Sequence, residues 1–206
     1  MYKKPIIVFE GIEGSGKTSH IKFVENFLKK EKLKYLKIRE PGGSSNAEKI
    51  RSLILKKNSS FNKTTDLLLY LSARSENIEL LKKNFRKKII LIDRFIDSTI
   101  AYQHYGMGVN LNLIKTINNF LIKDIKIDFT FLYTVDKKNM FSRLKERKNL
   151  NRYDKFKFSF YNKVQNGFLK LSKKNKKKYL IVNSNLDIDF NKNQIISQIK
   201  KILRWI

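Results

Sequence analysis

The chain has 206 residues, of which 41% are hydrophobic and 12% aromatic, so it is long and apolar enough to bury a core and is not a disordered chain. It contains no cysteine, which excludes disulfides, thiolate metal sites and a cysteine nucleophile. Lysine and arginine number 45 against 18 acidic residues, a formal net charge of +27, but the lysines are spread along the chain, which favours compositional bias over a nucleic-acid surface.

Short runs rich in β-branched residues alternate with segments whose apolar residues recur every three or four positions. In chain order, the pattern predicts strand Pro5–Glu10, helix Lys17–Lys30, strand Tyr35–Arg39, helix Thr65–Lys83, strand Lys88–Asp93, helix Asn112–Lys123, strand Asp128–Val135, strand Tyr179–Val182 and helix Asn191–Ile206. Further helical segments are expected at Ala47–Arg51, after the fourth strand, and before Lys173–Lys178. The alternation predicts an α/β fold, a doubly wound sheet of about five parallel strands flanked by helices.

One domain spanning residues 1–206 is expected, because no linker rich in proline, glycine or serine and no internal repeat divides the chain. No apolar run approaches the roughly 20 residues of a membrane span, and the first run, Pro5–Phe9, is too short for a signal peptide. A cytoplasmic protein without a membrane partner is therefore expected. The segment Arg143–Asp154, dense in charge and poor in aliphatic residues, is expected to be mobile.

The segment Gly11–Thr18, Gly-Ile-Glu-Gly-Ser-Gly-Lys-Thr, matches the phosphate-loop pattern of spaced glycines followed by lysine and threonine. Glycines let the backbone turn its N–H groups toward phosphate oxygens, and the helix that begins near Lys17 adds its positive end. Lys17 is expected to reach the β- and γ-phosphates of ATP, and the Thr18 hydroxyl to ligate Mg²⁺. The residues predicted to bind the ATP phosphates are Gly11, Gly14, Ser15, Gly16, Lys17, Thr18 and Ser19.

Three further clusters follow the loop in a distinctive order. They are Arg39-Glu40-Pro41-Gly42-Gly43-Ser44, the stretch from Asp93 to Gln103, and the arginine-rich segment Arg143–Arg152. Together with the loop, and over nearly the whole chain, they resemble the thymidylate kinase (dTMP kinase) family. The resemblance implies a phosphate-loop nucleoside monophosphate kinase fold, ATP- and Mg²⁺-dependent conversion of dTMP to dTDP in dTTP synthesis, and a homodimer to which the helix Thr65–Lys83 contributes. Nucleic acid is not an expected partner.

Asp93 and Arg94 end the predicted strand Lys88–Asp93. Ligands bind at the carboxyl ends of the strands in open α/β sheets. An aspartate there can hold a Mg²⁺ shell, and an arginine beside it can clamp two phosphates through its planar guanidinium. In the family, the matching aspartate and arginine lie at the donor and acceptor phosphates.

The resemblance also implies a pocket for dTMP. Tyr70 matches the aromatic residue that stacks on thymine, usually phenylalanine, and Arg74, one helical turn later, matches the arginine that hydrogen-bonds the base. Thr99 and Gln103 match positions near the base edge, and Tyr102 matches the tyrosine that favours a deoxyribose. The other residues implied at the sugar and monophosphate are Glu13, Arg39, Pro41, Arg51 and Arg94.

Residues 143–154 match the lid of the family, which closes over ATP and brings positive charge to the transferred phosphoryl group. Gly14 stands where one form of the family has an arginine in the loop, so the catalytic arginine is expected in the lid, as in the bacterial form. Lys145 stands where an arginine is common, and the region of Met107 lacks an arginine that members often carry. The catalytic residues implied are Lys17, Arg94, Arg143, Arg147 and Arg152.

Two alternatives stay open at this level. A related phosphate-loop kinase would act on another nucleoside or monophosphate. A nucleic-acid-stimulated ATPase is favoured only by the net charge of +27. The sequence allows either isomer of the Glu40–Pro41 peptide bond.

Overall fold

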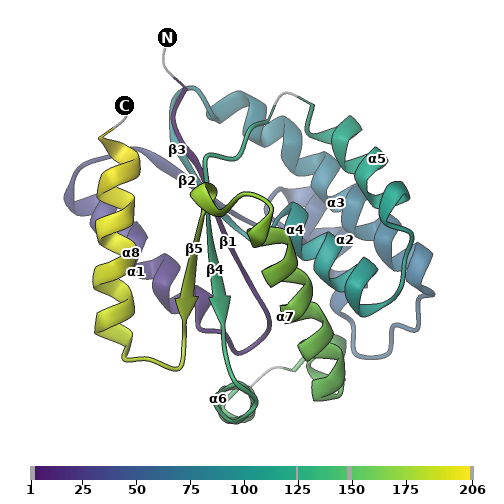
Figure 1. Cartoon of the computed structure of the whole chain (residues 1–206). Coiled ribbons are helices and arrows are strands. Elements are labelled where there is room, and N and C mark those ends of the chain that lie inside the picture. The colour runs from purple at the N-terminus through teal and green to yellow at the C-terminus, as the bar shows by residue number, and fades with distance from the viewer. Residues whose placement is uncertain (1–2, 124, 148–149, 205–206) are drawn as a thin grey trace.

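Five parallel strands form one sheet in the order β2-β3-β1-β4-β5, as Figure 1 shows. The computed structural model describes residues 3–123, 125–147 and 150–204. Strand β1 is central, because β3 pairs with one of its edges and β4 with the other. The strands are β1 (Ile6–Gly11), β2 (Tyr35–Arg39), β3 (Ile89–Asp93), β4 (Phe129–Thr134) and β5 (Tyr179–Asn183).

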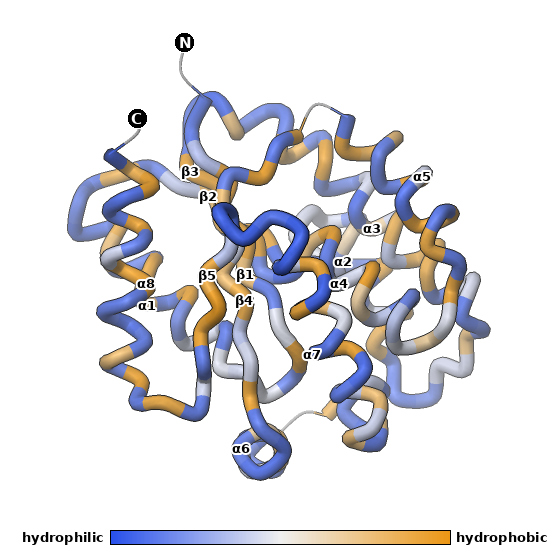
Figure 2. Tube along the Cα trace, in the orientation of Figure 1, coloured by the Kyte–Doolittle hydropathy of each residue, from blue (hydrophilic) through white to orange (hydrophobic). Residues whose placement is uncertain are grey.

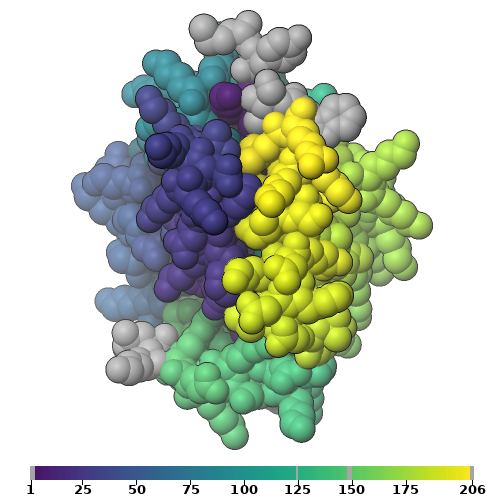
Figure 3. Space-filling model, turned by 90° about the vertical axis from the view of Figure 1, so that its left-hand side faces the viewer, coloured from purple at the N-terminus to yellow at the C-terminus, as the bar shows by residue number. Residues whose placement is uncertain are grey.

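Helices cover both faces of the sheet. The α-helices are α1 (Lys17–Lys30), α2 (Ser45–Leu55), α3 (Lys63–Asn84), α4 (Ile96–Thr99), α5 (Leu111–Leu121), α6 (Lys137–Lys145), α7 (Phe158–Lys173) and α8 (Ile188–Leu203). A π-helical segment, η1 (Ile100–Gly106), continues α4, and η2 (Arg152–Lys155) and η3 (Lys176–Lys178) are short 3₁₀ helices. Helices α1 and α8 lie side by side on one face, which Figure 3 shows in purple and yellow.

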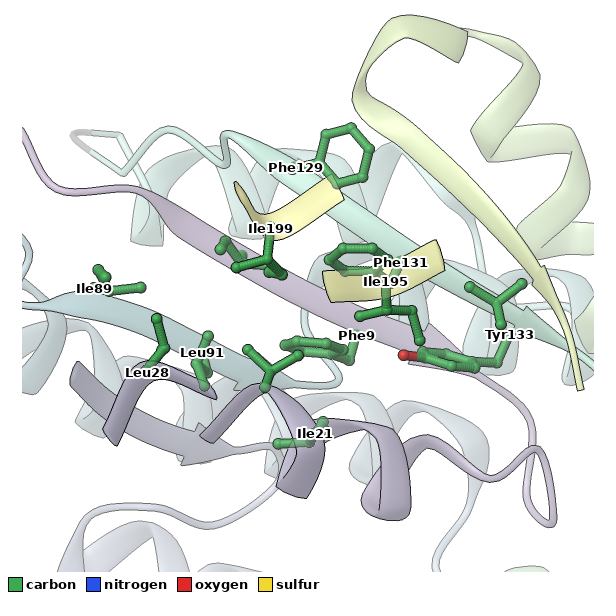
Figure 4. Close-up of a cluster of buried hydrophobic side chains, with 13 residues drawn as sticks. Phe9, Ile21, Leu28, Ile89, Leu91, Phe129, Phe131, Tyr133, Ile195 and Ile199 are labelled. Carbon is green, nitrogen blue, oxygen red and sulfur yellow. The ribbon is translucent and has the colours of Figure 1, made fainter. Parts of the chain in front are cut away.

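One large apolar cluster lies between the sheet and the α1–α8 pair. Phe9 of β1 stacks on Phe131 of β4, with ring centroids 5.4 Å apart. Ile195 of α8 lies beside these rings and Leu28 of α1 lies near Leu91 of β3, as Figure 4 shows, and both are fully buried. Figure 2 shows the central strands as hydrophobic stretches, whereas the outer helices alternate between hydrophobic and hydrophilic residues. Because the central strands are buried on both faces, their sequences are nearly continuous runs of apolar residues.

The strands that carry the candidate site all end at the same edge of the sheet. The loop after β1 leads into α1, Asp93 ends β3, and α6 follows β4 at the lower edge of the view in Figure 1. Parallel pairing places these carboxyl ends together, which is where ligands bind in open α/β sheets.

The predicted fold class is confirmed, and each predicted strand is present to within a residue at each end. Helix α8 begins before the predicted Asn191, because Asp187 caps it by accepting bonds from the N–H groups of Asp189 and Phe190. Residues 148–149 of the expected lid and residues 205–206 of the last predicted helix lie outside the described residues. Within the described ranges, no helix is both long and apolar enough to cross a membrane.

Candidate active site

The loop between β1 and α1 has the backbone that its glycines predict. Gly14 has a φ of +68°, in the left-handed region that favours glycine. A Cβ atom on Gly14 would lie 2.8 Å from the backbone oxygen of Met140 in α6, so no side chain fits there without a shift. The N-cap residue of α1 is Gly16, which has no side chain with which to cap the first-turn amides. The positive end of α1 is therefore open to an anion.

The ammonium group of Lys17 lies inside this loop. It donates hydrogen bonds to the backbone oxygens of Gly11 (2.8 Å) and Ile12 (3.0 Å) and to the hydroxyl of Ser15 (3.3 Å). Burial, together with the charge of Arg94, lowers the pKa of Lys17 to about 7, although nearby carboxylates oppose this shift. A polyphosphate in the loop would add negative charge and favour the protonated, cationic form.

Arg94 joins the end of β3 to the loop. Its Nη1 donates to the backbone oxygen of Gly11 at 2.7 Å, and its Nη2 to Glu13 at 2.9 Å. The guanidinium also lies over the ring of Tyr102, 5.2 Å from the centroid. Burial alone would lower the pKa of Arg94, but Tyr102, Glu13 and Asp93 raise it above its ordinary value, so the group stays cationic.

Glu13 is the matching anion. Burial would raise its pKa, but Arg94, Lys17 and a hydrogen bond from the hydroxyl of Tyr102 hold the pKa below its ordinary value. Glu13 is therefore ionised, and it fixes both the guanidinium and the tyrosine ring.

A cleft of about 500 Å³ opens in front of these groups. Its volume falls in the range of small-molecule sites. The cleft brings together many of the predicted site residues, namely Glu13, Lys17, Thr18, Arg39, Pro41, Arg51, Tyr70, Asp93, Arg94 and Arg147.

A smaller cavity of about 30 Å³ lies behind the cleft and shares Glu13, Tyr70 and Arg94 with it. The other predicted residues on its wall are Arg74, Thr99, Tyr102 and Gln103. Among the described residues, Oγ1 of Thr99 and Oε1 of Gln103 are buried without a hydrogen-bond partner. Such atoms are costly to bury unless a ligand or water satisfies them. At this volume the cavity holds a water molecule rather than a base.

Arg74 forms the back wall of the cavity. Its side chain is only 1% exposed and donates to Glu40 from Nε at 2.8 Å and to Asn118 from Nη1 at 2.5 Å. The guanidinium also lies over Phe95, 5.0 Å from the ring centroid. Burial raises the pKa of Glu40, and the Arg74 charge opposes this shift.

Arg39 and Arg51 line the outer part of the cleft. Arg39 forms a two-pronged ion pair with exposed Glu48, at 3.1 and 2.9 Å. Nη1 of Arg51 donates to the backbone oxygen of Pro41 at 2.5 Å. The Glu40–Pro41 peptide bond is cis. Both guanidinium groups therefore lie beside the loop that the resemblance places at the monophosphate.

The three arginines of the expected lid occupy different places. Arg143 of α6 donates to the backbone oxygens of Gly14 (3.0 Å) and Ser184 (2.7 Å), so it braces the outside of the phosphate loop. Arg152 forms an ion pair with buried Asp66 of α3. Arg147 lines the cleft and pairs with Asp154 at 2.8 Å, with its side chain 41% exposed.

Two residues that the sequence analysis does not identify, Asp66 and Tyr153, attach η2 to α3. Asp66 accepts hydrogen bonds from the hydroxyl of Tyr153 (2.7 Å) and from Gln103 (3.3 Å), in addition to its pair with Arg152. Tyr153 packs edge-on against Tyr70, with ring centroids 6.1 Å apart. An aspartate in a helical first turn usually signals a favourable helix end. The sequence therefore offered no signal of these long-range contacts.

The phosphate loop lies at the carboxyl edge of a parallel sheet and leads into a helix. Cationic side chains face the loop, and a second pocket adjoins it. This arrangement defines a phosphate-loop kinase of the nucleoside monophosphate type. The family model described as thymidylate kinase matches residues 9–195. The chain belongs to the thymidylate kinase family.

Individual relatives agree over almost the full length. A thymidylate kinase from Thermoanaerobacter sp. (strain X514) is 34% identical over 203 residues, covering 98% of this chain and 100% of the relative. One from Thermosipho africanus is 38% identical over 199 residues, covering 96% of each chain. The crystal structure of thymidylate kinase from Ehrlichia chaffeensis superposes with a TM-score of 0.77 at 32% identity, covering 97% of this chain and 99% of that one.

Replacing Glu40 with alanine should destabilise the protein by about 3–5 kcal/mol, because it leaves the guanidinium of Arg74 buried without its partner. Urea unfolding of the two proteins measures the difference. The matched control is Glu79→Ala, which removes an exposed partner of Lys82 and should cost less than about 1 kcal/mol. Equal losses in the two variants would contradict a buried, tightly held Arg74.

Proposed function

We propose that the chain transfers the γ-phosphoryl group of ATP to dTMP and releases ADP and dTDP. The observation that carries the proposal is the adjacency of two sites on either side of Arg94. One is the phosphate loop, and the other is a small cavity lined by unpaired polar atoms. The relatives and the structural neighbour are thymidylate kinases, which supplies dTMP as the acceptor. Neither alternative, another base specificity or a nucleic-acid-stimulated ATPase, is favoured by these comparisons.

The ATP phosphates bind at the loop, where the backbone amides and the positive end of α1 face them. Lys17 changes partners from the carbonyl groups of the loop to the β- and γ-phosphates. The residues proposed to hold the donor phosphates are Gly11, Gly14, Ser15, Gly16, Lys17, Thr18 and Ser19.

The thymine ring of dTMP enters the smaller cavity. Tyr70 stacks on it, and Thr99 and Gln103 supply the hydrogen-bonding atoms that are otherwise unsatisfied. Because the cavity is only about 30 Å³, the side chains at its mouth must move to admit a base. Tyr153 lines the larger cleft and packs edge-on against Tyr70, so its displacement is part of binding.

The sugar and monophosphate of dTMP lie in the larger cleft. Tyr102, held by Glu13, lies beside the sugar position, and Arg74, on the back wall of the smaller cavity, hydrogen-bonds the base. The residues proposed to face the sugar and phosphate are Glu13, Arg39, Pro41, Arg51, Arg94 and Tyr102.

No general base is needed, because the phosphate oxygens of dTMP are already nucleophilic. Catalysis then consists of placing the two phosphates in line and neutralising their charge. Arg94 is suited to touch both phosphates, since its planar guanidinium lies between the loop and the acceptor cavity.

Mg²⁺ fits the oxygen donors at the edge of the cleft. The Thr18 hydroxyl and the Asp93 carboxylate both line it, and magnesium sites commonly use one or two protein oxygens together with substrate phosphates and water. Within the described ranges, no cluster of three or more acidic or histidine side chains offers an all-protein metal cage. When bound with ATP, the ion would supply positive charge that offsets the negative charge of the phosphates during transfer.

Arg147 is the lid arginine that we propose to reach the transferred phosphoryl group. It already lines the cleft, its side chain is 41% exposed, and buried Asp154 keeps a hydrogen bond from the N–H of Asn151 when Arg147 turns to the phosphate. Arg143 and Arg152 are held by other segments in this structure, and their predicted catalytic roles remain part of the proposal. The lid assignment to residues 143–154 within a single domain of residues 1–206 remains a prediction.

We also propose that two copies pair through α3 and its neighbour α2. Leu68 of α3 is 47% exposed and Leu53 of α2 is 51% exposed, although both are large apolar residues. Sedimentation velocity tests this directly, because Leu68→Glu should shift a dimer toward monomer, and a monomeric wild-type chain would reject it.

The direct test of the reaction is ADP production from ATP across a panel of monophosphates. Turnover should be stimulated most by dTMP, and Lys17→Ala should reduce kcat by about 10²-fold or more, because it removes the cation in the phosphate loop. Greatest stimulation by dUMP or dCMP would overturn the choice of base. ATP turnover raised by DNA or RNA but not by dTMP would overturn the kinase proposal.

Tyr70→Ala should raise KM for dTMP by about tenfold or more, because one aromatic–base stack is lost, and should leave KM for ATP nearly unchanged. Steady-state kinetics with each substrate varied in turn measure both constants. Tyr70→Phe is the matched control, since it keeps the ring and removes only the hydroxyl. An equal rise in both KM values for Tyr70→Ala would place Tyr70 away from the base.

Arg147→Ala should lower kcat by about 10³-fold while ATP and dTMP still bind, because the charge it supplies acts mainly in the transition state. Single-turnover kinetics and equilibrium nucleotide binding separate the two effects. Lys138→Ala, which removes an exposed lysine of α6, is the control for a general loss of positive charge. A neutral result for Arg147→Ala would move the role to Arg143 or Arg152.

A further inference from the structure

Glu10 is a buried carboxylate to which the reaction described above gives no role. It lies on β1 directly before the phosphate loop and is 1% exposed. Its Oε1 accepts hydrogen bonds from the backbone N–H groups of Phe95 (2.8 Å) and Ser98 (3.2 Å), and its Oε2 accepts one from the Ser98 hydroxyl (2.5 Å). Three donors from the segment after β3 therefore converge on one side chain of β1.

These donors form the beginning of the helix that carries the acceptor pocket. Phe95 is the N-cap residue of α4, and its own side chain makes no capping hydrogen bond. An apolar residue is a poor N-cap, because the first amides of the helix lack an acceptor. The Glu10 carboxylate supplies that acceptor from another strand, and its charge also suits the positive end of the helix. The same helix continues into η1, which carries Tyr102 and Gln103.

Glu10 also lies beside the backbone of Arg94. Arg94 has a φ of +66°, a conformation that costs free energy for a residue with a side chain. Its N–H donates to the backbone oxygen of Phe9 at 3.0 Å, and the next N–H, that of Phe95, donates to Glu10. Nη1 of Arg94 lies 3.4 Å from the Ser98 hydroxyl, which Glu10 also holds. Strand β1 thus fixes both the backbone and one side-chain contact of Arg94.

We propose that Glu10 is a positioning residue for phosphoryl transfer, which keeps Arg94 and the acceptor-facing side of α4 and η1 aimed at the phosphates. It touches neither nucleotide and acts through Phe95 and Ser98. The inference rests on the proposed function, because dTMP binding and turnover report on it. Burial and the neighbouring Asp97 carboxyl raise the pKa of Glu10 to about 7, so assays above that pH keep the acceptor ionised.

The primary test is Glu10→Gln, which preserves size but replaces an acceptor oxygen with an N–H donor. We expect KM for dTMP to rise and kcat to fall by about tenfold each, because the phosphate clamp is misplaced. KM for ATP should change by less than about twofold, since the three donors to Glu10 belong to the acceptor side. The matched control is Glu25→Gln, which changes a partly buried carboxylate of α1 that accepts from Tyr35 and Lys37 and should leave KM for dTMP near the wild-type value.

A double-mutant cycle then separates positioning from mere support of the fold. The affinity for dTMP is measured by calorimetry in the wild type, Glu10→Gln, Arg94→Lys and the double variant. If Glu10 acts through Arg94, Glu10→Gln should weaken binding far less in the Arg94→Lys background than in the wild type. Additive effects would overturn the proposal, as would an unchanged KM for dTMP or an equal rise in both KM values.

Ser98→Ala keeps the test decisive if Glu10→Gln fails to fold. It removes one of the three donors, and it should raise KM for dTMP by about threefold while KM for ATP stays constant. An unchanged KM for dTMP in a folded Ser98→Ala protein would then overturn the proposal. Failure of the proposed function is distinguishable, because it would show as a wild-type protein without dTMP-dependent ADP release.

Discussion

The site depends on one largely buried contact, the guanidinium of Arg94 held against Glu13 and the Gly11 carbonyl; the Arg94 side chain is 18% exposed. A cation so far removed from water is costly unless its hydrogen bonds and charge are matched, so this contact allows only a narrow range of geometries. The parallel pairing of β1 with β3 brings the two ends of the contact together, although they are 81 and 83 residues apart in the chain. The phosphate loop and the acceptor cavity are thereby joined through one side chain.

Two further acid–arginine pairs surround the acceptor side, Glu40 with Arg74 and Asp66 with Arg152. Buried pairs of this kind add little net stability compared with apolar packing, but removing one partner is costly, so they restrict where each guanidinium can lie. The ion pair between Asp66 and Arg152 also holds η2 against α3, the helix that contains Tyr70 and Arg74. A segment of the expected lid and the proposed pocket for the base are therefore directly connected. Binding of the acceptor and placement of the lid are expected to influence each other for this reason.

Much of the fold could be predicted from the sequence, because strands buried on both faces leave continuous apolar runs, and helix α1 repeats Ile21, Val24 and Leu28 on one face. The phosphate loop could be predicted because its glycines and Lys17 are local in sequence. The residues of the acceptor pocket came from family resemblance, and the structure places most of them on one cleft or its cavity. The side-chain contacts between residues far apart in the sequence could not be predicted. Asp66 and Glu10 resemble ordinary charged residues at a helix end and a strand end, and only the fold brings their partners to them.

The central claim is that two nucleotides lie end to end across Arg94, with their phosphates in contact. The most direct measurement is inhibition by a bisubstrate analogue in which adenosine and thymidine are joined through a polyphosphate bridge. The account predicts competitive inhibition against both ATP and dTMP, with the analogue binding more tightly than either nucleotide alone, because one molecule fills both sites. Competition with ATP but not with dTMP would contradict it, since the cavity behind Arg94 would then not be the acceptor site.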